Sequence, residues 1–280
     1  STTFKNDLIW TASTTTGYGF TDSILKSGHH LFDSVLHAKV LGQLTEMSER
    51  WSCGDPDATR TVRGRIVAAL NGPLLWNESS GMFRPSSGNN ANLTDVWGSA
   101  LAVDAGLVTD DRAARIVSWF GAHWSEVVQD GQIRHLPLVG RGVVGGAPAG
   151  EYWPDTTTWQ HQTFANGGYW AMASSFVLPV IATNDTVVAQ SLVRDAIDLV
   201  RHEGVLSEWS NNKFCCNCQG AASWSAPCMT PYPSVAALKG AQSFGASATA
   251  VLHAARRLLG NMTVSNVQMS HHPTPPHAAS

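Results

Sequence analysis

The chain has 280 residues, of which 43% are hydrophobic and only 14% charged, and its net charge is −3. No basic stripe is present, which argues against nucleic acid as a partner. No apolar run has the roughly 20 residues of a membrane span, and the longest, at 176–182, contains Pro179. We therefore expect a globular protein with a large core, no membrane span and no nucleic-acid partner.

Apolar residues recur at three- and four-residue steps along most of the chain, a pattern typical of helices. The first predicted helix covers 23–51, with Thr21 and Asp22 placed as its N-cap. Its apolar stripe consists of Leu25, Phe32, Leu36, Val40, Leu44, Met47 and Trp51. Further helices are predicted at 57–76 with a break at Gly72-Pro73, and at 95–105, 110–128, 168–182, 186–202 and 244–259.

These predicted helices alternate in character. Segments 95–105 and 168–182 are apolar almost all round, whereas 110–128 and 186–202 are amphipathic. Two concentric rings of helices require this order, because inner helices are buried on all sides and outer helices face water. Loops 129–165 and 204–242 exceed thirty residues, and such loops usually build a site. No period-two run is long enough for a sheet, so an all-α fold is expected, with an ordinary helical bundle as the alternative to rings.

Four glycosylation sequons, at Asn77, Asn92, Asn184 and Asn261, fall in predicted loops or at helix ends, as glycosylation requires. The chain also has five cysteines: Cys53, Cys215, Cys216, Cys218 and Cys228. No His follows the Cys-Cys-Asn-Cys run at zinc-finger spacing, so disulfides are favoured over a metal site, with one Cys free or paired with another chain. These features favour a secreted glycoprotein.

No cofactor is expected, because the chain lacks a Gly-Lys-Ser/Thr phosphate loop and a dinucleotide-binding Gly fingerprint. A Gly-x-Ser-x-Gly elbow is also absent from the sequence. Eleven Trp residues either fill a core or line a groove, where their flat faces would stack on sugar rings.

Five ordered segments resemble motifs of the six-hairpin glycosidase superfamily, specifically of an uncharacterised bacterial-type branch. They are Gly-Tyr-Gly-Phe-Thr-Asp-Ser-Ile-Leu-Lys-Ser-Gly at 17–28, Asp-Val-Trp-Gly-Ser-Ala-Leu-Ala-Val at 95–103, Gly-Gln-Ile-Arg-His-Leu-Pro at 131–137, Asn-Gly-Gly-Tyr-Trp at 166–170 and Ser-Glu-Trp at 207–209. The match covers about residues 17–255.

The resemblance implies an (α/α)6 barrel, here over 1–262, with the site where loops enter the inner helices. The tail at 263–280 is expected to be disordered, because its last part is rich in His and Pro. A complete barrel has twelve helices, whereas about seven are predicted, so the barrel is expected to be incomplete in this chain. Another chain that supplies the missing hairpins, or a homo-oligomer, is the expected partner.

The superfamily commonly hydrolyses glycosidic bonds with two carboxylic acids and inverts the anomeric centre. Phe20-Thr-Asp-Ser23 is similar to the Trp-Asp-x-Ser acid motif of trehalases and of glucosidases that trim N-glycans, with one extra residue before the acid. Asp22 is therefore the predicted acid, and Glu208, beside Trp209, the predicted base. The alternatives are that Asp22 is only a helix cap and Glu208 a plain loop carboxylate.

Other residues are predicted to bind the sugar through hydrogen bonds and aromatic faces. They are Tyr18, Phe20, Asp95, Trp97, Arg134, His135, Glu151, Trp153, Asn166, Tyr169, Trp170 and Trp209. Asp95 has a second interpretation as a simple helix cap, and His29-His30 is interpreted as structural or surface.

Two hypotheses follow. The first is a glycoside hydrolase that acts on a glycan. The second is a non-catalytic secreted glycoprotein that keeps the barrel as a structural or carbohydrate-binding subunit of an extracellular assembly, because folds outlive functions.

Overall fold

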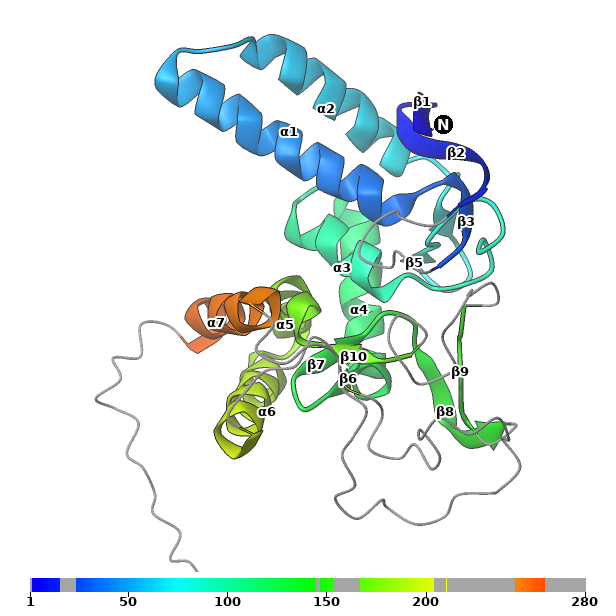
Figure 1. Cartoon of the computed structure of the whole chain (residues 1–280), viewed down its shortest axis with the longest axis vertical. Helices are drawn as coiled ribbons and strands as arrows, with labels where there is room; N and C mark the ends of the chain where they lie inside the picture. The colour runs from blue at the N-terminus through cyan, green and yellow to red at the C-terminus, as the bar shows by residue number, and fades with distance from the viewer. Residues whose placement is uncertain are drawn as a thin grey trace, which may run out of the picture.

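The computed structural model describes residues 2–15, 24–144, 147–153, 167–203, 210 and 245–259. Within this part of the chain, seven α-helices are accompanied by short antiparallel strands (Figure 1). The helices are α1 (Leu31–Trp51), α2 (Pro56–Leu70), α3 (Val96–Asp104), α4 (Asp110–Val127), α5 (Ser174–Asn184), α6 (Thr186–Glu203) and α7 (Gly245–Leu259), and a 3-10 turn, η1 (Ala171–Ala173), leads into α5. No helix in these ranges combines the length and the apolar character that a membrane span needs.

Successive helices pack in pairs, α1 with α2, α3 with α4 and α5 with α6. Helix α3 also contacts α1 and α5, and α5 contacts α7, so these four form one continuous row. Seven of the nine residues of α3 are buried, whereas α4 buries only Ile116, Phe120 and Val127. The predicted alternation of buried and amphipathic helices is therefore confirmed for α3 and α4. The closed ring is not formed by the described helices alone.

The first helix begins later than predicted. Residues Lys26–His29 form strand β3, which pairs with β2 (Leu8–Thr15), and β2 pairs in turn with β1 (Thr2–Lys5). Gly28 has φ +80°, and a Cβ there would lie 2.6 Å from the Ser87 hydroxyl and 2.7 Å from the Gly88 nitrogen, so this position is not helical and is suited to glycine. The predicted N-cap at Thr21 and Asp22 is wrong, because His30 is the N-cap of α1.

Further short strands occupy segments predicted as loops or as the ends of helices; β10, for example, lies at the start of the helix predicted at 168–182. They are β4 (Trp76–Asn77), β5 (Met82–Phe83), β6 (Val128–Gln129), β7 (Gln132–Arg134), β8 (Leu138–Val144), β9 (Ala147–Gly150) and β10 (Tyr169–Trp170). Most contain two to four residues, which is too short for a period-two pattern to be recognised. The all-α prediction therefore holds for the main architecture but misses these small sheets. Helix α2 ends at Leu70, before Gly72-Pro73, instead of continuing to Trp76.

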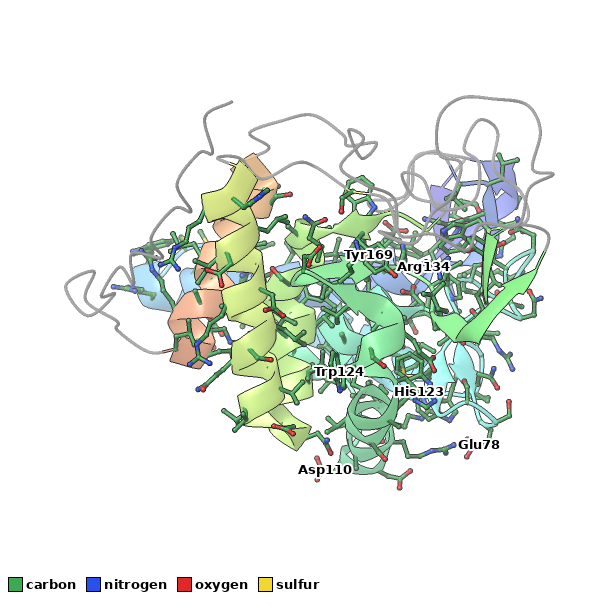
Figure 2. The ribbon with its side chains drawn as sticks, turned by 90° about the horizontal axis from the view of Figure 1, so that it is seen from below. Glu78, Asp110, His123, Trp124, Arg134 and Tyr169 are labelled. Atoms are coloured by element: carbon green, nitrogen blue, oxygen red, sulfur yellow. The ribbon has the colours of Figure 1, made fainter. Side chains whose placement is uncertain are left out.

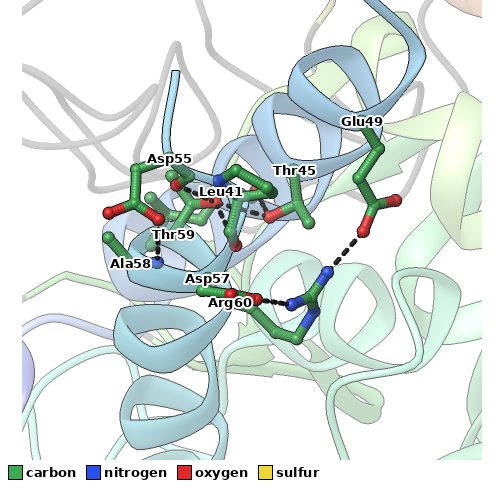
Figure 3. Close-up of polar contacts among 9 residues, drawn as sticks. Leu41, Thr45, Glu49, Asp55, Asp57, Ala58, Thr59 and Arg60 are labelled. Carbon is green, nitrogen blue, oxygen red and sulfur yellow. Dashed lines mark hydrogen bonds and ion pairs between the residues drawn. The ribbon is translucent and has the colours of Figure 1, made fainter. Parts of the chain in front are cut away.

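The α1–α2 hairpin is joined near its tip by polar contacts, as Figure 3 shows. The Thr45 and Thr59 hydroxyls lie 2.8 Å apart, and Arg60 of α2 pairs with Glu49 of α1. The Asp55 carboxylate caps α2 by accepting from the Ala58 N–H at 2.9 Å. These groups are mostly exposed and contribute little stability. The hairpin is held mainly by buried apolar residues, Val35, Ala38 and Leu41 of α1 and Ile66 and Leu70 of α2.

Helix α5 continues through Pro179, which lies inside it. A proline lacks the N–H that would bond the carbonyl four residues earlier, here that of Ser175. In the structure the Arg257 guanidinium of α7 approaches the Ser175 oxygen, with Nη1 at 3.4 Å. The neighbouring helix therefore supplies a donor that the proline removed.

The apolar stripe predicted for the first helix is real, but most of it is not in the core. Leu36, Val40, Leu44 and Met47 are 38–46% exposed, and Trp51 is 60% exposed. The core face of α1 is instead the side that contacts α2. Helix α1 therefore has a second apolar face, which the other described residues leave exposed.

A glycine substitution tests the packing of the β6–β7 turn against α6. Gly131 has φ +68°, and a Cβ there would lie 2.4 Å from the Leu192 oxygen. We expect Gly131→Ala to lower the free energy of unfolding by about 3 kcal/mol or more, since backbone strain and overpacking add. Gly106, at φ +62° with open space around it, is the control, and Gly106→Ala should cost about 1–2 kcal/mol. Urea denaturation measures both, and equal losses would contradict the packing argument.

Candidate functional site

The segments that precede α1, α3 and α5 are tied to their neighbours by backbone hydrogen bonds. The Leu31 N–H donates to the Pro85 oxygen and the Val96 N–H to the His135 oxygen, both at 3.1 Å. Strand β10, just before η1 and α5, pairs with β7, and Tyr169 lies opposite Arg134. Predicted site residues in the described part lie on these segments and on the stretch after β9: Asp95, Trp97, Arg134, His135, Glu151, Trp153, Tyr169 and Trp170.

His135 is the centre of this cluster. Its Nε2 lies 2.9 Å from the Asp95 carboxylate, and its ring stacks on Trp97 with centroids 4.5 Å apart and planes 4° from parallel. The edge of Trp153 approaches the same ring, with centroids 5.2 Å apart. The buried Nδ1 of His135 has no hydrogen-bond partner among the described residues. The described residues thus hold the imidazole through one nitrogen and leave the other without a partner among them.

Asp95 has the cap role that was the simpler interpretation, and a second role as well. Its Oδ1 accepts from the Gly98 N–H at 2.7 Å, which caps α3, and the same oxygen contacts His135. Because Asp95 is 1% exposed, both contacts lie away from water. Asp95 therefore starts α3 and orients His135.

Trp97 links the aromatic residues of the cluster. It packs edge-on against Trp170, with centroids 6.0 Å apart and planes at 83°, in addition to its parallel stack with His135. All of Trp97, Trp153 and Trp170 are at most 1% exposed. The binding role predicted for these residues is untested, but they form one continuous aromatic group.

Arg134 is fully buried beside this group. Its Nη2 donates to the Glu151 backbone oxygen at 3.1 Å, and its guanidinium lies 4.6 Å from the centroid of the Tyr152 ring. Its Nε and Nη1 are buried without a hydrogen-bond partner in the described ranges. Figure 2 shows Arg134 next to Tyr169, away from Glu78 and Asp110. Burial raises the pKa of the Tyr169 phenol to about 12, while the charge of Arg134 acts in the opposite direction.

Glu151 contacts the segment before α3. Its Oε2 accepts from the Thr94 N–H at 2.5 Å and its Oε1 from the Thr94 hydroxyl at 2.9 Å. Burial raises the pKa of Glu151, and the two hydrogen bonds and the charge of Arg134 oppose that rise. These contacts fix Thr94, and with it the adjacent Asp95, to the stretch after β9.

Two buried basic residues were not predicted as site residues. Lys26 of β3 is 4% exposed, and its Nζ lies 5.9 Å from the centroid of the Trp153 ring. His30 is 1% exposed, and its Nε2 lies 2.9 Å from the Thr11 hydroxyl. Burial, with the charges of Lys26 and His29, lowers the pKa of His30 to about 4. The interpretation of His30 as structural agrees with these contacts, but Lys26 gave no sequence signal.

Several predictions fall outside the described residues: Tyr18, Phe20, Asp22, Asn166, Glu208, Trp209, Asn261, Cys215, Cys216, Cys218 and Cys228. Among the described sequons, Asn92 and Asn184 are exposed and Asn77 is half-buried. Cys53 is exposed and free. In the described ranges, no group of three or more His, Cys, Asp or Glu side chains could hold a metal ion.

No protein-family model matches the chain, and a search of curated proteins finds no match. Among solved structures, the chain is similar to a GH63 mannosylglycerate hydrolase from Thermus thermophilus. For its complex with glucose, the TM-score is 0.51 at 14% identity, over 81% of this chain and 47% of that chain. For its complex with Tris, the values are 0.50, 16%, 81% and 44%. An uncharacterised conserved protein from the same organism gives 0.49, 14%, 81% and 47%.

The chain thus spans less than half the length of these solved structures. At this identity the likeness concerns the fold alone. This likeness is consistent with the predicted fold as far as a mostly helical, six-hairpin glycosidase-like architecture. The closed barrel stays a prediction.

The low pKa of His30 predicts a loss of stability in acid. His30 stays neutral in the folded protein down to about pH 4, whereas in the unfolded chain it takes up a proton near its ordinary value of 6.5. The unfolded state therefore binds more protons as pH falls from 7 to 4, and His30 alone lowers the free energy of unfolding by about 3 kcal/mol over that range.

Urea denaturation at pH 7, 6, 5 and 4 measures this dependence in the wild-type chain and in His30→Gln. The variant should lose the part of the pH dependence that His30 contributes. Parallel curves for the two proteins would contradict the assignment, whatever their difference in stability at pH 7.

Asp95 and Asp55 each cap a helix through one backbone N–H, but Asp95 is buried and Asp55 is exposed, so their Ala variants can be compared directly. We expect Asp95→Ala to lower the free energy of unfolding by about 3 kcal/mol, because the Gly98 N–H and His135 both lose a partner away from water. Asp55→Ala removes only the exposed bond to Ala58 and should cost about 1 kcal/mol. Equal losses in thermal or urea denaturation would exclude the second role of Asp95.

Proposed function

We propose that this chain acts on a glycan as a glycoside hydrolase, at a site beside the N-terminal ends of α1, α3 and α5. The proposal rests on two described residues that follow the candidate carboxylic acids closely in the sequence. Ile24, two residues after Asp22, packs with Leu136 and Trp153 of the cluster. Ser210, two residues after Glu208, pairs with Tyr169 through two backbone hydrogen bonds of 2.7 and 2.9 Å.

Chain geometry supports bringing both acids to one place. Two extended residues span at most about 7 Å, so Asp22 and Glu208 are each tethered closely to a residue that contacts the cluster. The Ser210 hydroxyl also donates to the Gln132 side chain at 2.6 Å, which strengthens its link to β7. Carboxylic acids in that region suit acid–base chemistry on a ligand held there.

The unpaired polar atoms favour a ligand rich in hydroxyl groups. Within the described ranges, Arg134 Nε and Nη1 and His135 Nδ1 are buried without partners, and each such group costs about 1–3 kcal/mol. A saccharide carries hydroxyls that accept from the guanidinium and bond to the imidazole, and its apolar ring faces suit aromatic surfaces. The fold likeness to a mannosylglycerate hydrolase, solved with glucose, gives the same indication.

The proposed reaction uses Asp22 as the acid and Glu208 as the base. The Asp22 carboxyl donates its proton to the glycosidic oxygen as the bond to the anomeric carbon breaks. The Glu208 carboxylate takes a proton from a water that attacks that carbon from the opposite face, so the configuration inverts. For this geometry the two carboxyl groups should be about 6–10 Å apart.

The simpler interpretation of Asp22, as the cap of the first helix, is excluded. Helix α1 begins at Leu31, nine residues after Asp22, and its N-cap is His30.

We also propose an extracellular location with glycans on the exposed sequons. Asn92 and Asn184 are accessible to a glycosyltransferase, whereas the Asn77 side-chain oxygen accepts from the Ser79 N–H and hydroxyl. Disulfides among the four cysteines at 215–228 would fit the same compartment.

Activity is tested with a panel of chromogenic aryl glycosides and reducing-end-labelled oligosaccharides. We expect turnover of at least one, and a loss of about 10²–10⁴-fold in kcat for Asp22→Asn and Glu208→Gln. Asp110→Asn, at an exposed carboxylate that starts α4, is the control and should keep wild-type activity. Proton NMR of the first-formed product should show inversion at the anomeric carbon.

Two outcomes would contradict the enzyme. Wild-type turnover in both acid variants would remove Asp22 and Glu208 from the mechanism. Saccharide binding in a glycan array or by calorimetry, with no cleavage of any bound saccharide, would favour the non-catalytic carbohydrate-binding subunit instead.

A further inference from the structure

Helix α1 presents an apolar face that the other described residues do not cover. It consists of Leu36, Val40, Leu44, Met47 and Trp51, the last of which is 60% exposed. The helix already uses its opposite side, with Val35, Ala38 and Leu41, to pack in the core. A helix that is apolar on two opposite sides generally has a partner on each of them.

The spacing of this face is regular. Leu36 and Met47 are eleven residues apart, as are Val40 and Trp51. Eleven residues make almost a whole number of turns, so the stripe runs nearly parallel to the helix axis. Its length is about 22 Å at 1.5 Å per residue. Such a stripe suits a second straight helix laid alongside it.

A groove of about 340 Å³ opens beside the first half of the stripe. It is lined by Phe32, Leu36, Lys39, Val40 and Gln43 of α1 and by Leu101, Met172 and Phe176 from α3, η1 and α5. The lining is mostly apolar, and the groove is large enough for an indole side chain. The stripe thus has a hollow at one end and a protruding Trp51 at the other.

We propose that α1 forms the two-fold interface of a homodimer, antiparallel to α1 of a second copy. When the stripes are centred on each other, Leu36 lies opposite Trp51 and Val40 opposite Met47, each contact occurring twice. Trp51 of each copy then packs on Leu36 of the other, at the edge of its groove, and a buried Trp is a typical anchor of a protein interface. Self-complementarity of this kind is what a two-fold interface requires.

The charges beside the stripe favour this orientation. Lys39, Glu46 and Arg50 follow one flank of the helix, and in an antiparallel two-fold pair the same flanks meet. Lys39 then lies within two residues, about 3 Å along the axis, of Glu46 in the other copy. Arg50 approaches Asp104, whose carboxylate is 3.6 Å from Lys39 Nζ.

A parallel pair lacks this complementarity. It would place the charged flank against the other flank of the stripe, where His37 and Ser48 lie and no carboxylate faces Lys39. The tip of the α1–α2 hairpin also extends away from α3–α7 (Figure 1), and the stripe residues are 38–60% exposed.

The first experiment is a charge-reversal cycle read by sedimentation equilibrium, with circular dichroism as the check on folding. The wild-type chain should be a dimer, and Lys39→Glu or Glu46→Lys should each weaken the dimer about tenfold or more. The double variant K39E/E46K should restore it, and an equimolar mixture of the two single variants should form a heterodimer. The double variant also lacks the Lys39–Asp104 pair. Restored dimerisation in that variant would therefore show that the single variants act at the interface and not through loss of the pair.

A monomeric wild-type chain at about 100 µM would overturn the proposal and leave the stripe to a different chain, such as one that supplies further helical hairpins. A double variant as dissociated as the single ones would also overturn it. Trp51→Ala should raise the dissociation constant about 30-fold or more without loss of helix content, because the side chain is an exposed anchor in the monomer.

A second experiment reads the orientation. In the antiparallel pair the two Gln43 residues meet near the two-fold axis, whereas the two Cys53 residues lie more than about 25 Å apart. Oxidation of Gln43→Cys should give a 43–43 cross-linked peptide in mass spectrometry. A 53–53 cross-link in the wild-type dimer, with no 43–43 cross-link in Gln43→Cys, would exclude the antiparallel arrangement.

Discussion

The buried carboxylate of Asp95 is the interaction on which the rest of the site depends. One oxygen accepts from the first turn of α3 and also contacts His135, while the backbone of His135 accepts from Val96. The same short segment is held on its other side by Glu151 through Thr94. Helix, strand and loop are therefore fixed to one another at a single point, and the aromatic stack on Trp97 follows from that geometry.

The cluster is well ordered, but some of its buried polar atoms have no partner among the described residues. Arg134 and His135 are adjacent in sequence, and each keeps buried polar atoms without a partner in the described part of the chain. Proteins rarely leave such atoms unpaired unless something else bonds to them. The proposed saccharide would bond to these atoms. Lys26, buried near Trp153, adds a positive charge to the same region.

Helical periodicity predicted α4, α6 and α7 to within about two residues, because each buries one face and exposes the other. It failed at 23–30, where β3 pairs with residues far back in the sequence and Gly28 adopts a positive φ. Most residues of the cluster were recognisable from motifs, but Lys26 was not, since burial of a charge depends on tertiary neighbours. Periodicity also identified the stripe on α1 without showing that its apolar face would lie outside the core.

Arg257 has a consequence for the order in which this chain folds. Its guanidinium reaches both the Asp104 carboxylate, at 2.5 Å, and the Ser175 carbonyl left unpaired by Pro179. During synthesis on a ribosome, α3 and α5 emerge long before residue 257, so both wait without that partner. That donor can be added only after α7 has left the exit tunnel. Chains that stop before α7 should therefore leave the Ser175 carbonyl without it and expose the side of α5 that α7 covers.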